Sequence, residues 1–483
     1  MALRWLALSC IIVSVISAAL LFNEFHAISS DAGQHYALVR ALMDQDVWGR
    51  PFAPYLTEDL TSYPPISHWM AAEVGKIAGS GFVGMTIIAS ASVGIFYFAM
   101  NAISLRVDCR APLIAAVITI GYALLRGPVF GRLVVNNYFY AQVVGSSIAV
   151  FTMLLVLSKL HKWNGLVIDL VVVVAVQIIV ATHLMPAAQL AACYCMVLLV
   201  LAQRRFSWAV VGRLILFVAL SLLLTRFSPF AVDVYRIAQA EGGAHINLFG
   251  DRRAQIALLL VGIFASIRLI RKNREKEDAG LILGCMGLGT CSYASLQIIL
   301  FGFGVGSSYA IDKNMFLVVA IFIFVFSANL ALARRPAVDS RLNSLPAGLI
   351  VCSLLALLMA RVDLFPSVLN LGPVVQFQQA ARTMAARLNS NDVRRPIAMG
   401  SLWPRNLSYG ITIGDMRLNM KLGEMLLNDE APPVDLVSIL FLPQGDPAII
   451  PSCFLDEYSN NSAVAMDYSC FARSQSRLLL LNK

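Results

Sequence analysis

The feature that most constrains this chain is a series of long apolar segments that recurs from the N-terminus to about residue 362. A membrane-spanning helix needs about 20 mostly apolar residues, because a bilayer holds no water to satisfy exposed backbone groups. Hydrophobic residues make up 58% of the chain and charged residues 13%, whereas soluble domains average about 45–50% and 25%. We therefore predict a polytopic α-helical membrane protein with about eleven spans, at 4–22, 81–105, 111–125, 139–158, 166–181, 184–202, 209–224, 254–270, 279–300, 314–333 and 344–362.

The last part of the chain has a different composition. Residues 1–362 form the predicted membrane domain, while residues 363–483 mix charged, polar and apolar positions. Within this second part, local patterns predict one helix and several strands, at 374–388, 396–399, 434–441 and 477–481. We expect residues 363–483 to be a small soluble α/β domain.

Basic residues indicate which way the chain crosses the membrane. Lys and Arg gather in alternate short loops, beginning with Arg106 and Arg110 and continuing with Lys159, Lys162, Arg204, Arg205, the 271–276 run, Arg334, Arg335 and Arg341. The positive-inside bias places these loops in the cytoplasm, together with the N-terminus, and places residues 363–483 outside. Topology thus accounts for most of the net charge of +9, and no nucleic-acid partner is expected.

Cysteines and nucleotide-binding motifs narrow the possible functions. Cys453 and Cys470 lie in the predicted exported domain, where an oxidising compartment makes such a pair a disulfide candidate; two unpaired thiols are the alternative. The sequence has no P-loop, no GxGxxG opening a helix and no GxSxG elbow. ATP-driven transport by this chain alone is not expected.

The first outer loop, residues 23–80, contains the main acidic candidates. Asp31 precedes a segment with Ala37, Leu38, Ala41 and Leu42 on one helical face, which predicts an amphipathic helix on the membrane surface. Asp31 could cap this helix, or it could act as a general base for an acceptor hydroxyl near a lipid phosphate. Glu58 and Asp59, later in the same loop, are competing or secondary carboxylates.

The same loop continues with a Tyr-Pro-Pro turn. Two prolines fix an extended turn between Tyr63 and His68, ahead of a second short amphipathic segment. The turn could be structural, with Trp69 as an anchor at the membrane interface.

Polar residues also occur beside the predicted spans. His183 lies at a helix break before Pro186, where a packing role and a ligand-binding role are both open. Lys313 follows Tyr309 at the mouth of the span 314–333, in the predicted outer loop 301–313. Lys313 could neutralise a phosphate or pair with Asp312.

Taken in order, these segments resemble the GT-C superfamily of integral-membrane glycosyltransferases, which includes protein mannosyltransferases, lipid A aminoarabinose transferases and cell-wall arabinosyltransferases. The matching features are an acid early in a long first outer loop, a Tyr-Pro-Pro turn followed by His, a Thr-His pair at a helix break and a late Tyr-x-x-x-Lys, at Asp31, 63–68, 182–183 and 309–313. Two departures are the single acid in place of an adjacent acidic pair and the absence of a WWD-type signature. Both argue against block transfer to asparagine.

The resemblance implies an inverting transfer of one sugar from a polyprenyl-phosphate carrier to an extracytoplasmic glycan, lipid or protein, with Asp31 as general base. Glu58 and Asp59 would assist with the acceptor. The residues expected to contact the lipid-linked donor and its phosphate are Lys313, Tyr309, Arg126, Arg132, His68, Tyr63 and His183. No cofactor is expected, and a divalent metal stays open. We expect the protein in a bacterial inner membrane, in contact with membrane lipids.

Two other functions remain open. A lipid or sugar transporter would also be polytopic, although the sequence shows no internal repeat relating two halves. A Wzy-like polysaccharide polymerase would concentrate arginines in large outer loops, and Arg226, Arg236, Arg252 and Arg253 do cluster in or beside the loop 225–253.

Overall fold

The computed structural model describes residues 35, 38–39, 42–43, 63–79, 81–124, 130–131, 139–160, 162–205, 207–230, 252–272, 278–333, 439–443 and 476–480. The chain divides into two compact units. The first, which we call the helical unit, contains helix α5 from Ala89 onward and the helices up to residue 333. The second, the mixed unit, contains α4, the start of α5 and two strands.

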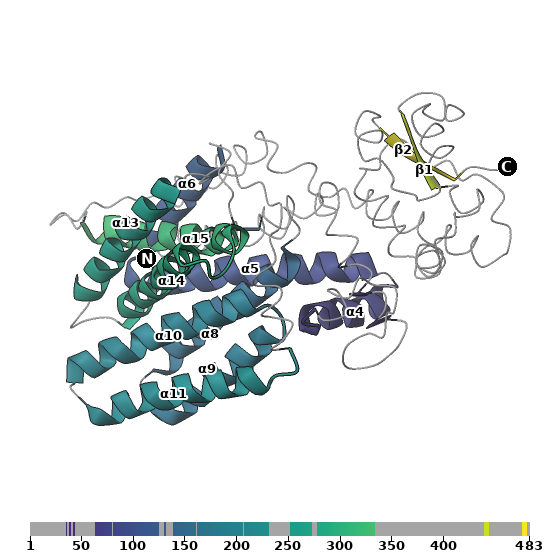
Figure 1. Cartoon of the computed structure of the whole chain (residues 1–483). Coiled ribbons are helices and arrows are strands. Elements are labelled where there is room, and N and C mark those ends of the chain that lie inside the picture. The colour runs from purple at the N-terminus through teal and green to yellow at the C-terminus, as the bar shows by residue number, and fades with distance from the viewer. Residues whose placement is uncertain are drawn as a thin grey trace. The chain divides into compact units, whose positions relative to one another are not determined.

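Apolar helices make up the described part of the helical unit (Figure 1). They are α5 (Gly81–Val107), α6 (Ala111–Leu124), α8 (Tyr140–Lys159), α9 (Gly165–Val180), α10 (Leu184–Arg205), α11 (Trp208–Phe227), α13 (Arg252–Lys272), α14 (Asp278–Gly302) and α15 (Ser308–Ala333). In the part of the chain that the structure describes, seven are long and apolar enough to cross a membrane, while α6 and α9 are shorter apolar helices. The chain is a polytopic helical membrane protein.

The predicted spans between residues 81 and 333 each coincide with one of these helices. The first and last predicted spans, 4–22 and 344–362, lie outside the described residues. The largest boundary difference is at α15, which begins at Ser308 and not at 314, so Tyr309 and Lys313 lie on its first turns and not in a loop. The Ser307 hydroxyl accepts a hydrogen bond from the Ala310 amide at 3.1 Å and satisfies a donor at this early start.

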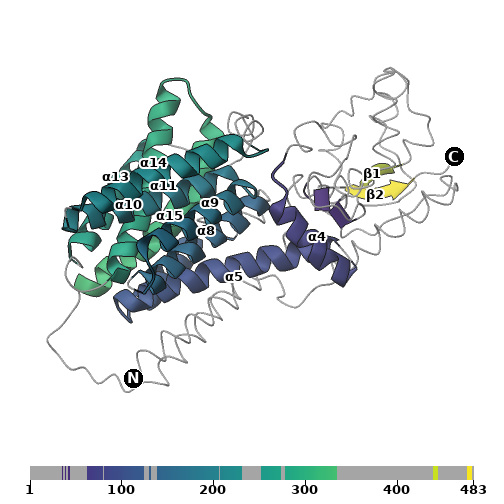
Figure 2. The same ribbon diagram turned by 90° about the horizontal axis from the view of Figure 1, so that it is seen from below.

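Helix α14 packs mainly against α10, α13 and α15, and it also contacts α8 (Figures 1 and 2). Glycines permit this close approach. A Cβ atom added at Gly289 would lie 2.5 Å from the Cα atom of Cys193 on α10, and one added at Gly284 would lie 3.0 Å from the carbonyl oxygen of Ser266 on α13. Small residues at helix contacts are typical of membrane proteins, where packing rather than hydrophobic burial holds helices together.

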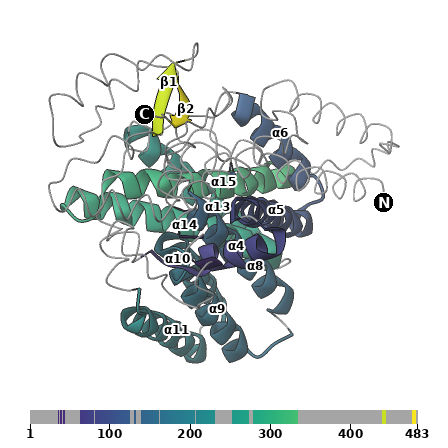
Figure 3. The same ribbon diagram turned by 90° about the vertical axis from the view of Figure 1, so that its right-hand side faces the viewer.

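Helix α11 lies at the outer edge of the helical unit, against α9 and α10 (Figure 3). Large apolar side chains cover its exposed surface, including Trp208 and Phe227, which are 78% and 76% exposed. This surface suits contact with lipid. On the inner side of α11, Arg213 forms an ion pair with Asp169 of α9, and Tyr194 of α10 donates a hydrogen bond to the same carboxylate.

Basic side chains gather at the C-terminal end of α15. Arg110, which precedes α6, donates a hydrogen bond to the carbonyl of Ala331 at 2.7 Å, and Lys272 of α13 donates one to the carbonyl of Leu332 at 2.8 Å. These carbonyls belong to the last turn of α15, where the helix dipole favours positive charge. Two of the predicted basic loops therefore meet at one end of the helical unit.

The mixed unit contains the amphipathic helix α4 (Ile66–Ala78), which follows the two prolines. Its buried face includes Ser67, His68, Ala71, Ala72 and Gly75. A Cβ atom added at Gly84, near the start of α5, would collide with the backbone of this face. Earlier in the chain, His35, Leu38, Val39 and Leu42 are helical and buried, with the spacing of a single helical face.

Two short strands are described in the C-terminal part of the mixed unit. Strands β1 (Ile439–Pro443) and β2 (Ser476–Leu480) pair antiparallel, with Ile439 opposite Leu480. They overlap the strands predicted at 434–441 and 477–481. The predicted helix 374–388 and strand 396–399 lie outside the described residues, so the α/β class of this region stays a prediction.

Candidate functional site

Two groups of polar side chains contain most of the described candidate residues, one group in each unit. The larger group, in the helical unit, centres on Lys313. The Nζ atom of Lys313 lies 4.2 Å from the ring centre of Phe139 and 4.3 Å from that of Tyr309. Tyr309 precedes Lys313 by one helical turn, so both project from one face of α15. The predicted Tyr-x-x-x-Lys pair is thus a physical contact.

His183 lies in the turn before α10 and is buried, 8% exposed. Its Nδ1 atom accepts a hydrogen bond from the amide of Met185 at 3.3 Å. Burial lowers the pKa of His183 to about 3, and the positive charge of Lys313 contributes to this lowering. His183 is therefore neutral and lies within electrostatic reach of Lys313, although the two residues come from separate segments.

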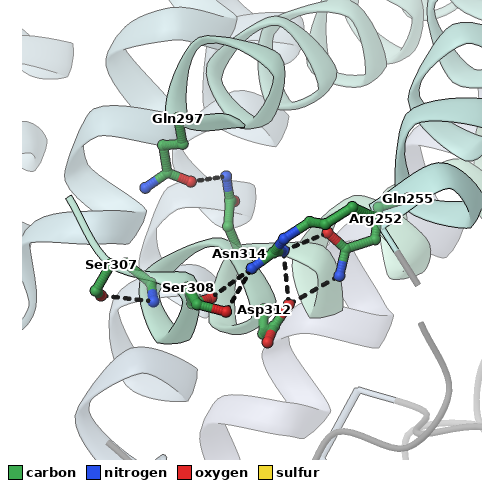
Figure 4. Close-up of polar contacts among 8 residues, drawn as sticks. Arg252, Gln255, Gln297, Ser307, Ser308, Asp312 and Asn314 are labelled. Carbon is green, nitrogen blue, oxygen red and sulfur yellow. Dashed lines mark hydrogen bonds and ion pairs between the residues drawn. The ribbon is translucent and has the colours of Figure 1, made fainter. Parts of the chain in front are cut away.

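Asp312 pairs with Arg252 (Figure 4). Its Oδ1 atom accepts hydrogen bonds from Nη1 of Arg252 at 2.9 Å and from Nε2 of Gln255 at 2.8 Å. Arg252 also donates to the hydroxyl of Ser308 at 2.6 Å. These contacts join the first turns of α13 and α15. Of the two sequence interpretations of Lys313, the one that paired it with Asp312 loses its support, because Arg252 and Gln255 hold this carboxylate.

A chain of amide hydrogen bonds lies beside Lys313. Gln189 of α10 donates to the side-chain oxygen of Asn314. Asn314 in turn donates to Oε1 of Gln297 on α14 at 2.6 Å (Figure 4). Gln297 then donates to the hydroxyl of Tyr293 at 3.1 Å. Gln142 of α8 donates to the backbone carbonyl of Lys313 at 3.0 Å.

These contacts gather one end of each of five helices. The starts of α8, α10, α13 and α15 and the end of α14 meet around residues 308–314. Each of these helix ends adjoins a loop that the sequence predicts on the outer side, at 126–138, 182–186, 225–253 or 301–313. The sequence assigned these loops to one side of the membrane, and the structure brings the adjoining helix ends together.

The second polar group lies in the mixed unit and contains His35, Tyr63 and His68. The Nδ1 atom of His35 and the Nε2 atom of His68 are 2.7 Å apart, so one nitrogen donates to the other. The Tyr63 ring stands edge-on to both imidazoles, with ring centres 5.4 and 5.3 Å away. Burial lowers the pKa of His68 to about 3, and the Pro64 carbonyl opposes this only in part.

Sequence reasoning missed some of these residues. His35 was not a candidate, although it follows Asp31 by four positions, the interval of one helical turn. Gln189, Gln297 and Asn314 were also missed. The available signal was their polarity near the ends of otherwise apolar segments.

Several predicted residues lie outside the described residues: Asp31, Glu58, Asp59, Arg126, Arg132, Cys453 and Cys470. The described residues alone contain no group of three or more His, Cys, Asp or Glu side chains placed to hold a metal ion.

Comparisons with protein-family models, with curated proteins and with solved structures give no match to this chain.

Proposed function

We propose that this chain is an inverting glycosyltransferase of GT-C type, which moves a single sugar from a polyprenyl-phosphate carrier to an extracytoplasmic glycan, lipid or protein. The observation that carries the proposal is the convergence of Lys313, Tyr309 and His183 at one end of the helical unit. These three residues are among those that the family resemblance assigns to donor binding. A lipid-linked donor would present its phosphate near such a helix end.

Lys313 supplies the charge that the donor needs. A phosphate leaving the aqueous headgroup layer loses hydration, and a charge-assisted hydrogen bond from an ammonium group compensates for that loss. The rings of Phe139 and Tyr309 hold the ammonium by cation–π contact. Arg126 and Arg132 are proposed to assist, and Tyr63 and His68 to contact the donor.

The proposed reaction needs one base and one stabilised leaving group. Asp31 removes the proton from the acceptor hydroxyl, whose oxygen forms a bond to the anomeric carbon. The bond from that carbon to the phosphate oxygen breaks, and polyprenyl phosphate leaves with the electron pair. Glu58 and Asp59 orient the acceptor.

We propose a topology to match. The eleven predicted spans place the N-terminus in the cytoplasm and residues 363–483 outside a bacterial inner membrane, with a disulfide between Cys453 and Cys470. The contacts of Arg110 and Lys272 with the last turn of α15 support this orientation, because they bring basic residues of two loops to the same end. A C-terminal reporter active only in the cytoplasm tests the placement, and thiol labelling of denatured, unreduced protein tests the disulfide.

The function is tested with purified full-length protein and lipid-linked sugar donors. Asp31→Asn keeps the size of the side chain but removes its basicity, so it should slow transfer by about 10²–10⁴-fold while donor binding persists. Asp46→Asn, a change of the same kind in the same loop, should leave turnover near normal. Near-normal transfer by Asp31→Asn would move the role of base to Glu58 or Asp59.

A Wzy-like polymerase is the second candidate, because Arg252 lies at the same helix end as Lys313. Product length separates the two functions. Addition of one sugar per acceptor supports the transferase, whereas a ladder of growing chains supports the polymerase. Mass spectrometry of glycans from a deletion strain gives the same distinction in cells.

A further inference from the structure

Two glutamine side chains near Lys313 have a buried oxygen atom that lacks a hydrogen-bond donor among the described residues. Gln142 on α8 is 4% exposed, and Gln189 on α10 is 1% exposed. Ser146, one helical turn beyond Gln142, has a third such oxygen. Leaving a buried polar atom unpaired is costly, so an unpaired atom in a native fold indicates a ligand or water that completes it.

The two amides approach the same turn of α15. Gln142 donates to the carbonyl of Lys313 at 3.0 Å, while Gln189 donates to the side chain of the next residue, Asn314. Nε2 of Gln142 is also 3.8 Å from the sulfur of Met185, which precedes Gln189 by one turn on α10. Both side-chain amides therefore donate to an acceptor on α15 and keep their own oxygen for another partner.

The proposed substrate indicates the kind of hydrogen-bond donor. A lipid-linked sugar carries neutral hydroxyl groups, and a hydroxyl group can donate to an amide oxygen. Each hexose or pentose ring carries several hydroxyl groups.

We infer that Oε1 of Gln142 and Oε1 of Gln189 bind hydroxyl groups of the sugar that is transferred. The inference rests on the proposed function, in which Lys313 binds the phosphate of the same donor. The phosphate contact alone does not distinguish one sugar from another, since every polyprenyl-phosphate donor carries a phosphate. The two amides then make the enzyme prefer a loaded carrier over an empty one.

The test compares equilibrium binding of loaded and empty carriers to the purified full-length protein. The probes are radiolabelled polyprenyl phosphates that carry glucose, mannose, galactose or arabinose, and bare polyprenyl phosphate. Gln142→Met and Gln189→Met keep side-chain length but remove the amide. Each should weaken binding of the preferred loaded carrier by roughly three- to tenfold and leave binding of the bare lipid unchanged.

Gln177→Met is the matched control. The side-chain amide of Gln177 on α9 also donates to a neighbouring helix, to the carbonyl of Ser221 on α11 at 3.4 Å. This variant should keep the full preference for the loaded carrier. If Gln142→Met does not purify as a folded protein, Gln142→Asn, which withdraws the amide by one methylene, takes its place in the same assay.

The outcomes separate this inference from the proposed function. The inference is supported if Gln142→Met and Gln189→Met lose the preference for the loaded carrier and Gln177→Met keeps it. Equal weakening for loaded and bare carriers shows that the amides only hold helices together, and unchanged binding shows that they hold water; either result overturns it. If none of the lipids binds the wild-type protein, the proposed function fails, and the inference fails with it.

Discussion

Arg213 on α11 and Asp169 on α9 are joined by two hydrogen bonds, 2.7 Å from Nε to Oδ2 and 2.8 Å from Nη2 to Oδ1. The same guanidinium donates to the carbonyl of Gly165 at 3.0 Å. Since α11 otherwise presents apolar side chains to lipid, this ion pair is its principal polar contact among the described residues. The pair fixes how α11 is turned against α9.

Replacing Arg213 by Met should destabilise the protein by about 2–3 kcal/mol, because the Asp169 side chain loses its cationic partner and keeps only the hydrogen bond from Tyr194. The loss is smaller than for a fully buried pair, since Arg213 is 22% exposed. Thermal unfolding in detergent measures the loss. Arg106→Met, at an exposed position at the end of α5, is the control and should change stability little. The double variant Asp169→Leu with Arg213→Met should recover part of the loss, and a double variant less stable than Arg213→Met alone would contradict this account.

The glycines of α14 give a second prediction. Gly289→Ala should destabilise the protein by about 1–3 kcal/mol, because the new Cβ meets the backbone of α10, which cannot yield as a flexible side chain would. Gly302→Ala on the same helix has nothing within 4 Å of its added Cβ and should be neutral. Equal unfolding temperatures for the two variants would show that the α10–α14 contact is looser than described.

Lys313 should dominate binding of the bare carrier. Lys313→Met removes a charge-assisted hydrogen bond to phosphate and should weaken binding of polyprenyl phosphate by roughly 10- to 100-fold. Lys159→Met is a close control. Lys159 also lies over an aromatic ring, with its Nζ atom 4.9 Å from the centre of Trp163, but it is at the C-terminal end of α8, whereas Lys313 is near the start of α15. Unchanged affinity in Lys313→Met would remove the phosphate assignment, and partial rescue by Lys313→Arg would support it.

Acid should destabilise the mixed unit through His68. The pKa of its imidazole is about 3 in the folded chain, against an ordinary value of 6.5, so the unfolded chain binds more protons between these values. Stability is then fully present above pH 6.5 and falls as the pH drops toward 3, by up to about 1.4 kcal/mol per pH unit. Unfolding temperatures between pH 7.5 and 4.5 measure this slope.

A substitution of His68 measures how much this residue contributes to the dependence of stability on pH. His68→Gln cannot take up the proton and should show a shallower loss of stability in acid than the wild type. His183 has a similarly lowered pKa, so His183→Gln should flatten the slope by its own share and the double variant should flatten it most. A slope in His68→Gln equal to that of the wild type would show that the imidazole titrates normally.

The helices were largely predictable, because apolar runs of bilayer length have few alternatives to a spanning helix. The partners of individual side chains were not. Asp312 pairs with Arg252, sixty positions earlier in the chain, although Lys313 is its neighbour in sequence. His35 meets His68 across 33 positions. Such pairs depend on which helices pack together, and local sequence patterns do not predict that packing.

The start of α15 shows the same limit. The predicted span began at residue 314, directly after the charged residues Asp312 and Lys313. In the structure Arg252 and Gln255 satisfy Asp312 within the helix. A polar segment can thus be helical at a bundle end when neighbouring helices supply its hydrogen bonds.

The amide chain from Gln189 to Tyr293 has a direction, since every member donates to the next. Rotating one amide by half a turn would set two oxygens or two NH2 groups against each other, so Gln189, Asn314 and Gln297 must reverse together or not at all. The chain therefore has two possible senses. In one sense Gln189 offers an acceptor oxygen, and in the other it offers a donor, while the hydrogen of the Tyr293 hydroxyl turns to match, one helical turn before Gln297 on α14.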